Sequence, residues 1–105
     1  MPNKIDSGCR DRLEQVVVEH KDKLDRQLSF AFPIRNRNGC AMQFIWGIAV
    51  AVDDRKGNVV PLGIHSMYAS LGSIDSPLGL PLTNEHKDEA GRVLVRFEHG
   101  TIYWH

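Results

Sequence analysis

The tetrapeptide FIWG at residues 44–47 recurs 53 positions later as FEHG at residues 97–100. Upstream of these elements, FAFP at residues 30–33 is followed 48 positions later by LGLP at residues 78–81. The difference between the two intervals predicts a five-residue insertion in the charged loop of the second copy. The sequence therefore predicts two tandem units. Because a unit of about 50 residues cannot enclose its own apolar face, the two units must pack together.

In the first half of the chain, the pattern of apolar residues predicts a helix followed by a hairpin. Apolar side chains at helical spacing predict an amphipathic helix over residues 7–25. Alternating polarity from residue 40 predicts a strand over residues 40–52 that bends at Gly47 and turns Trp46 toward the core. The polar start of residues 53–60 predicts a hairpin turn and a short returning strand.

The second half repeats this order with a shorter helix. Residues 64–71 have their apolar side chains on one helical face, and Gly72 is placed to end that helix. Alternation over residues 93–97 predicts a strand, which bends at Gly100 before the apolar residues 102–104. The expected fold class is α+β, mainly β, in a single domain over residues 1–105.

Composition excludes several functional classes. The chain has 105 residues, a formal net charge of zero and a hydrophobic fraction of 42%. Because it has no excess of positive charge, a strongly basic nucleic-acid-binding protein is excluded. The longest apolar stretch, at residues 44–52, is much shorter than a membrane-spanning helix, so no membrane insertion is expected.

The N-terminal sequence and the cysteines bear on the compartment. The N-terminus, MPNKID, lacks the apolar run of a signal peptide. The chain as written is therefore expected to be cytoplasmic, or to belong to the cell envelope if it is cut from a longer secreted parent. Cys9 and Cys40 are too few for a disulfide scaffold and fit no zinc motif. Two free thiols are preferred over one bridge, and the pairing stays open.

Three separated blocks of the second half resemble one LGFP repeat. They are IHSMYASLG at residues 64–72, LGLPLTNE at residues 78–85 and FEHGTIYW at residues 97–104. The match covers about residues 63–105, and about residues 13–60 are interpreted as a degenerate copy. The resemblance implies non-catalytic repeats of cell-envelope proteins that anchor to wall glycan and pack like propeller blades in larger arrays.

The degenerate copy departs from the repeat pattern at three places. FA at residues 30–31 stands where LG belongs, Arg35 and Arg37 stand where Thr and Glu belong, and AVA at residues 49–51 stands where IYW belongs. The expected architecture is therefore two tandem helix-plus-β-hairpin repeats, packed together like propeller blades, with an added N-terminal helix.

Six residues are candidates for ligand binding: Tyr103, Trp104, His99, His105, Tyr68 and Glu85. Aromatic faces suit the C–H face of a pyranose ring, whereas the competing interpretation places such rings in the core and is favoured for Tyr68. Glu85 either binds a sugar hydroxyl or fixes the loop after Pro81. The two histidines flank Trp104 in the sequence. No nucleophile, phosphate-binding or metal motif is recognisable, so no catalytic residue, metal ligand or cofactor is assigned.

Three functional hypotheses follow from the sequence. The first is a non-catalytic binding module for a cell-wall or cell-surface glycan. The second is a protein–protein interaction or self-assembly unit that forms a homo-oligomer, since two repeats are fewer than arrays usually need. The third, an enzyme, rests only on scattered histidines and acidic residues.

Overall fold

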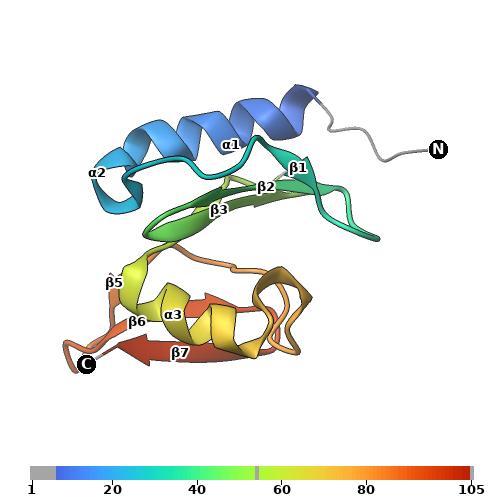
Figure 1. Ribbon diagram of the computed structural model, residues 1–105. Helices are drawn as coiled ribbons and strands as arrows, with labels where there is room; N and C mark the ends of the chain where they lie inside the picture. The colour runs from blue at the N-terminus through green and yellow to red at the C-terminus, as the bar shows by residue number, and fades with distance from the viewer. Residues whose placement is uncertain (1–6, 54, 105) are drawn as a thin grey trace.

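The computed structural model describes residues 7–53 and 55–104, and within them it contains two antiparallel sheets and three α-helices (Figure 1). The first half contains α1 (Ser7–Glu19), α2 (Lys21–Leu24), β1 (Phe32–Pro33), β2 (Gly39–Phe44), β3 (Gly47–Val52) and β4 (Asn58–Val60). The second half contains α3 (Leu62–Leu71), the 3-10 helix η1 (Ser73–Asp75), β5 (His86–Lys87), β6 (Val93–Phe97) and β7 (Gly100–Trp104). The α+β class is confirmed.

The first sheet has the strand order β1-β2-β3-β4. The expected single strand over residues 40–52 is wrong, because β2 and β3 are two strands that pair with Phe44 opposite Gly47. Ile45 and Trp46 form the two-residue turn between them. Neither residue is typical of a tight turn, so contacts from elsewhere in the chain must hold this one.

The second sheet has the order β5-β6-β7, and its hairpin turns in the same way. Phe97 lies opposite Gly100, so the bend expected at Gly100 is a complete reversal of the chain. Helix α3 is confirmed and ends at Gly72, which adopts a left-handed conformation. The expected helix over residues 7–25 is interrupted at His20, whose backbone leaves the helical region, and the four residues of α2 follow it.

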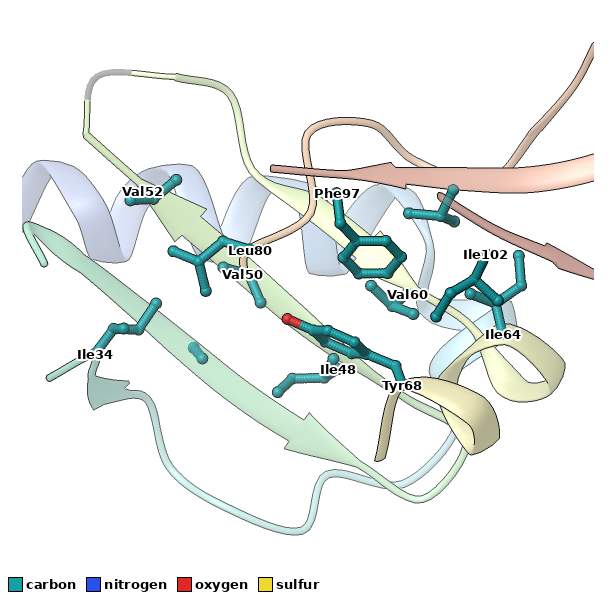
Figure 2. Close-up of a cluster of buried hydrophobic side chains, with 12 residues drawn as sticks. Ile34, Ile48, Val50, Val52, Val60, Ile64, Tyr68, Leu80, Phe97 and Ile102 are labelled. Atoms are coloured by element: carbon teal, nitrogen blue, oxygen red, sulfur yellow. The ribbon is translucent and has the colours of Figure 1, made fainter. Parts of the chain in front are cut away.

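Two clusters of buried side chains lie on opposite faces of the first sheet. On one face, α1 packs through Leu13 and Val16 against β2 and β3. On the other face, Ile48 of β3 packs with Tyr68 of α3 and Phe97 of β6, and the rings of Tyr68 and Phe97 have centroids 4.5 Å apart (Figure 2). The layers therefore run from α1 through the first sheet to α3 and the second sheet (Figure 1).

A disulfide joins the first helix to the first sheet. Cys9 of α1 bonds to Cys40 of β2, with Cα atoms 6.3 Å apart. The preference for two free thiols is therefore wrong. Sequence separation gave no sign of this pairing, because the two cysteines meet only once α1 lies across the sheet.

The two hairpins are held by equivalent backbone hydrogen bonds. In the first, Ile45 N–H donates to Arg26 O at 2.9 Å and Trp46 N–H to Leu24 O at 3.3 Å. In the second, the corresponding donors are Glu98 to Leu80 O at 3.0 Å and His99 to Leu78 O at 2.9 Å. The segment before each sheet thus supplies two carbonyl oxygens that accept hydrogen bonds from the turn. These bonds hold the turn although it lacks the glycine or asparagine that tight turns usually contain.

The equivalence extends to the hydroxyl groups that follow these carbonyls. Ser29 Oγ accepts from Gln43 N–H at 3.0 Å, and Thr83 Oγ1 accepts from Arg96 N–H at 3.1 Å. Isolated bridges pair Gln27 with Phe44 and Pro81 with Phe97 in the same way.

These contacts correct the alignment of the two halves. They relate residues 24–29 to residues 78–83, an offset of 54, whereas the hairpins keep an offset of 53. The matching of FAFP at residues 30–33 with LGLP at residues 78–81 is therefore wrong. The segments that connect these residues to the hairpins differ by one residue, 14 positions from Ser29 to Gln43 against 13 from Thr83 to Arg96, and no five-residue insertion is needed.

We expect the disulfide to contribute strongly to stability. It closes a loop with a sequence separation of 31, and such a bridge stabilises a protein by roughly 2–4 kcal/mol. The double variant Cys9→Ala, Cys40→Ala should lose about that much free energy of unfolding in urea titrations. Dithiothreitol should lower the midpoint of the wild type and leave the variant unchanged. A wild type that is insensitive to the reductant would contradict this expectation.

Asp25 allows a test of the alignment between the two halves, because it occupies the position that Gly79 has in the second half. Both residues have a positive φ, 60° for Asp25 and 78° for Gly79, which costs a residue with a Cβ roughly 1 kcal/mol or more. Asp25→Gly should raise the free energy of unfolding by about 1 kcal/mol. Asp25→Ala is the matched control, since it removes the carboxylate and keeps the strain. Equal effects of the two variants would assign the gain to charge.

Candidate functional site

The two tryptophans of the chain line one open groove, although 58 positions separate them in the sequence. The groove has a volume of about 440 Å³ and lies where the β2–β3 turn and α2 approach the start of α3 and the end of β7. All of these elements meet at the left of Figure 1. Its lining is Asp22, Lys23, Trp46, Pro61, Leu62, Gly63, Ser66, Glu85 and Trp104.

Trp46 reaches this groove from the β2–β3 turn. The sequence pattern placed it in the core, which is wrong, because its side chain is 42% exposed. The alternation that predicted burial ends at Phe44, and Trp46 is the second residue of the turn. The match of FIWG with FEHG could have indicated that Trp46 is exposed. At the two middle positions the second copy has the polar residues Glu98 and His99, which are typical of an exposed turn.

Trp104 reaches the groove from the end of β7, and 52% of its side chain is exposed. Its indole lies against Gly63 of α3, where an added Cβ would be 2.5 Å from two ring atoms. Glycine is therefore the residue that allows the ring to lie on the helix backbone.

A second groove of about 450 Å³ continues from Trp104 along the face between α3 and β7. It is lined by Gly63, Ser66, Met67, Ser70, Tyr103 and Trp104. Tyr103 is also partly exposed, and the guanidinium of Arg92 lies 4.5 Å from its ring centroid. The two grooves share Gly63, Ser66 and Trp104, so they form one continuous surface that includes Trp104.

Charged side chains border the tryptophans. Glu85 forms an ion pair with Lys23 of α2, with Nζ and Oε1 3.7 Å apart, and both side chains stay partly exposed. An exposed pair of this kind contributes at most about 1 kcal/mol. Its polar atoms therefore remain available to exchange this contact for hydrogen bonds to a ligand. Asp22 adds a second carboxylate to the same groove.

The other candidates from the sequence lie elsewhere. Tyr68 is completely buried, and its hydroxyl donates to Gly79 O at 2.7 Å, so its ring offers no face to a ligand. Burial raises the pKa of Tyr68 above its ordinary value. His99 lies in the β6–β7 turn, at the opposite end of β7 from Trp104, so the histidine is not a neighbour of that ring. His105 lies outside the described residues.

An ion pair connects the two halves at the other end of the molecule. Arg37 donates two hydrogen bonds to the carboxylate of Glu98, each 2.9 Å long, and the same carboxylate accepts from Leu80 N–H at 3.0 Å. The hydrogen bonds from Arg37 lower the pKa of Glu98 to about 2. Since Glu98 also fixes the backbone at Leu80, the pair holds the hairpin of the second half against the first.

Comparison with protein families finds a match in the C-terminal part of the chain. Residues 78–105 match the LGFP repeat. The resemblance of this segment to that family is thereby confirmed. No curated protein matches the chain.

The structure assigns positions to the residues of this LGFP segment. Leu78 packs on Gly100, where an added Cβ would be 2.6 Å from the Leu78 side chain. Gly79 has a positive φ and Leu80 is buried. These residues fix the β6–β7 hairpin. Three other residues of the segment, Glu85, Tyr103 and Trp104, line the two grooves.

Neither a metal site nor a membrane span is found in the part of the chain that the structure describes. Over residues 7–53 and 55–104, no three His, Cys, Asp or Glu side chains converge as metal ligands would. In the same residues, no helix has the length and hydropathy that crossing a bilayer requires.

The Arg37–Glu98 pair predicts an acid-sensitive contribution to stability. Because the pKa of Glu98 falls from 4.5 to about 2 on folding, this contribution is present above pH 4.5 and is lost as the pH falls toward 2. The shift corresponds to at most roughly 3 kcal/mol, and partial exposure of Arg37 reduces that to about 1–2 kcal/mol.

Glu98→Gln tests this, because the amide keeps an acceptor for Leu80 N–H and loses the charge. Urea unfolding at about pH 7 and about pH 2.5 should show the wild type losing about 1–2 kcal/mol more than the variant between the two values. Glu89→Gln, an exposed carboxylate in the β5–β6 loop, is the control. Parallel curves for wild type and Glu98→Gln would refute the assignment.

Proposed function

We propose that this chain is a non-catalytic binding module built from two LGFP-like units, and that it binds a cell-wall or cell-surface glycan in the groove between Trp46 and Trp104. The observation that carries the proposal is the convergence of both tryptophans on one open groove bordered by Asp22, Lys23 and Glu85. Large exposed aromatic side chains gathered on a concave surface are typical of a binding site.

The equivalent hydrogen bonds of the two halves support the two-unit part of the proposal. The same donors and acceptors recur at offsets of 53 and 54, and they hold hairpins of the same register. In this interpretation α1 is the helix of the first unit rather than an addition to it. The helix of each unit covers its own sheet, and α3 also covers the sheet of the first unit, which is how propeller-like blades would stack.

The chemistry of the groove suits a carbohydrate. A pyranose ring presents an apolar C–H face that packs on an indole, and its hydroxyl groups donate to carboxylates such as Glu85 and accept from ammonium groups such as Lys23. The groove is open to solvent, so a polymer need not thread into a closed cavity to reach it. The disulfide between Cys9 and Cys40 supports a location outside the cytoplasm, because such bonds persist in oxidising compartments.

Binding to insoluble bacterial cell-wall glycan tests the proposal directly. The chain should sediment with the glycan, and its fluorescence should shift to shorter wavelength, because both of its tryptophans line the groove. Trp104→Ala and Trp46→Ala should each weaken binding about tenfold or more, since a stacked aromatic face contributes about 1–2 kcal/mol. Phe30→Ala is the matched control, because Phe30 is an exposed aromatic residue that does not line this groove. Full binding by both tryptophan variants would overturn the proposal.

Gly63→Ala is a gentler test of the same groove. Alanine favours the helix by about 1 kcal/mol relative to glycine, but its Cβ needs the space that the Trp104 ring occupies. We expect the variant to fold, to change the tryptophan emission spectrum and to lose glycan affinity. Unchanged emission and unchanged affinity together would show that the position of the ring does not matter.

A further inference from the structure

Gln43 of β2 connects the two ends of the turn that carries Trp46. Its side-chain amide nitrogen donates to Phe44 O at 2.9 Å and to Gly47 O at 3.0 Å. Phe44 and Gly47 lie opposite each other and close the β2–β3 turn, in which Trp46 is the second residue. The amide therefore holds the base of the turn from which Trp46 reaches the groove.

The same amide nitrogen reaches helix α3. It lies 3.2 Å from Nε2 of His65, which is partly buried. Carbonyl oxygens only accept hydrogen bonds, so the nitrogen of the Gln43 amide, and not its oxygen, must face Phe44 O and Gly47 O. Because an NH₂ group only donates, Nε2 of His65 must accept. The imidazole ring is therefore neutral and has its hydrogen on Nδ1. We call the contact between Gln43 and His65 the clasp.

The second hairpin forms the same turn without a clasp of this kind. At the offset of 53 between the hairpins, the position of Gln43 is occupied by Arg96, whose side chain is exposed. Both turns have the same register and accept the same support from the preceding backbone. The clasp is therefore an addition to the hairpin fold, and it is made at the turn that carries Trp46.

Protonation of His65 breaks this contact. The imidazolium has a hydrogen on each ring nitrogen, so Nε2 would meet the amide of Gln43 as donor against donor. Burial disfavours the charged ring and lowers the pKa of His65 from 6.5. The folded chain therefore takes up this proton at a lower pH than the unfolded chain. The clasp is intact above pH 6.5 and is lost as the pH falls below 6.5 through the pKa of the folded state.

The strands that pack on α3 bring no charged side chain to His65. Helix α3 packs on β3, β7 and η1, and neither β3 nor β7 contains a charged residue. The titratable groups of α3, of the elements around the clasp and of the groove are Tyr68, Tyr103, Asp75, Arg96, Asp22, Lys23, Arg26 and Glu85. A variant changed only at His65 keeps all of these groups, so it separates their titration from that of the ring.

We propose that Gln43 and His65 form a pH-sensitive clasp that positions Trp46, so that the groove holds its ligand at neutral pH and releases it in acid. Both are positioning residues, because they act through Trp46 and lie outside the lining of the groove. The release of a ligand rests on the proposed function, whereas the effect of the clasp on Trp46 does not.

Tryptophan fluorescence of the free protein tests the clasp without any ligand. In the background Trp104→Phe, Trp46 is the only tryptophan of the chain. Its emission should change between about pH 8 and about pH 4.5, with a midpoint below the ordinary histidine pKa of 6.5. His65→Gln keeps an acceptor for the Gln43 amide and cannot be protonated, so its emission should stay constant. Equal emission profiles of the two proteins would overturn the proposal.

Sedimentation with insoluble bacterial cell-wall glycan over the same pH range tests the release. The affinity of the wild type should fall about tenfold toward acid, which is the effect of losing about one hydrogen bond. His65→Gln should keep the neutral affinity in acid, and Gln43→Leu should have the acid affinity at every pH. His99→Gln is the matched control, since His99 is an exposed histidine of the β6–β7 turn, and it should follow the wild type.

Near-ultraviolet circular dichroism at neutral pH checks the fold of each variant. If Gln43→Leu does not fold, His65→Gln and His99→Gln carry the test by themselves. Parallel affinity profiles of the wild type and His65→Gln would contradict the pH-dependent release. If the wild type binds no glycan at any pH, the proposed function fails, and the emission of Trp46 still decides whether the clasp positions that ring.

Discussion

The whole structure depends on the need to cover the first sheet on both faces. All six residues of β3 are buried, so the strand has no polar face to leave in water. An antiparallel sheet of this kind needs an apolar layer on each side. Helix α1 covers one face, and α3 with the second sheet covers the other. The second half is therefore the cover of the first half, and the two share one core through Ile48, Tyr68 and Phe97.

The turns at residues 45–46 and 98–99 tolerate residues that are unusual in tight turns, because hydrogen bonds from outside each hairpin hold them. Tight hairpin turns normally rely on glycine or asparagine. Here the carbonyl groups of Leu24 and Leu78, and those of the residues two positions later, accept hydrogen bonds from the turns. The turn geometry is thus fixed from outside by the segment that precedes each sheet. In the segment that matches the LGFP repeat, Leu78 and Leu80 act in this way.

The elements that could be predicted from the sequence are those that local patterns determine. Helix α3 and strand β6 have a clear periodicity within one segment, and both formed as expected. The β2–β3 turn was missed because residues on both of its sides are apolar. A two-residue turn shifts the alternation, so Phe44 faces α1 whereas Ile48 faces α3, and with both faces buried this shift leaves no trace in the sequence.

The candidate site could be predicted only in part for the same reason. Trp104 and Glu85 were found because the repeat pattern marks them, and both line the groove. Trp46 and Lys23 were missed because they come from a turn and a short helix whose places depend on tertiary contacts. The bond between Cys9 and Cys40 likewise depends on how α1 crosses the sheet.

The contrast between AVA at residues 49–51 and IYW at residues 102–104 acquires a physical meaning from these contacts. The two triplets occupy equivalent positions at the end of a hairpin, but Ala51 is fully buried whereas about half of the Trp104 side chain is exposed. Ala51 belongs to the buried cluster in which α1 packs on the first sheet. Trp104 instead lies on Gly63 of α3 and lines the open groove. The small residues at 49–51 therefore fit a strand that is buried on both faces, whereas the aromatic pair at 103–104 fits a strand end that borders open grooves.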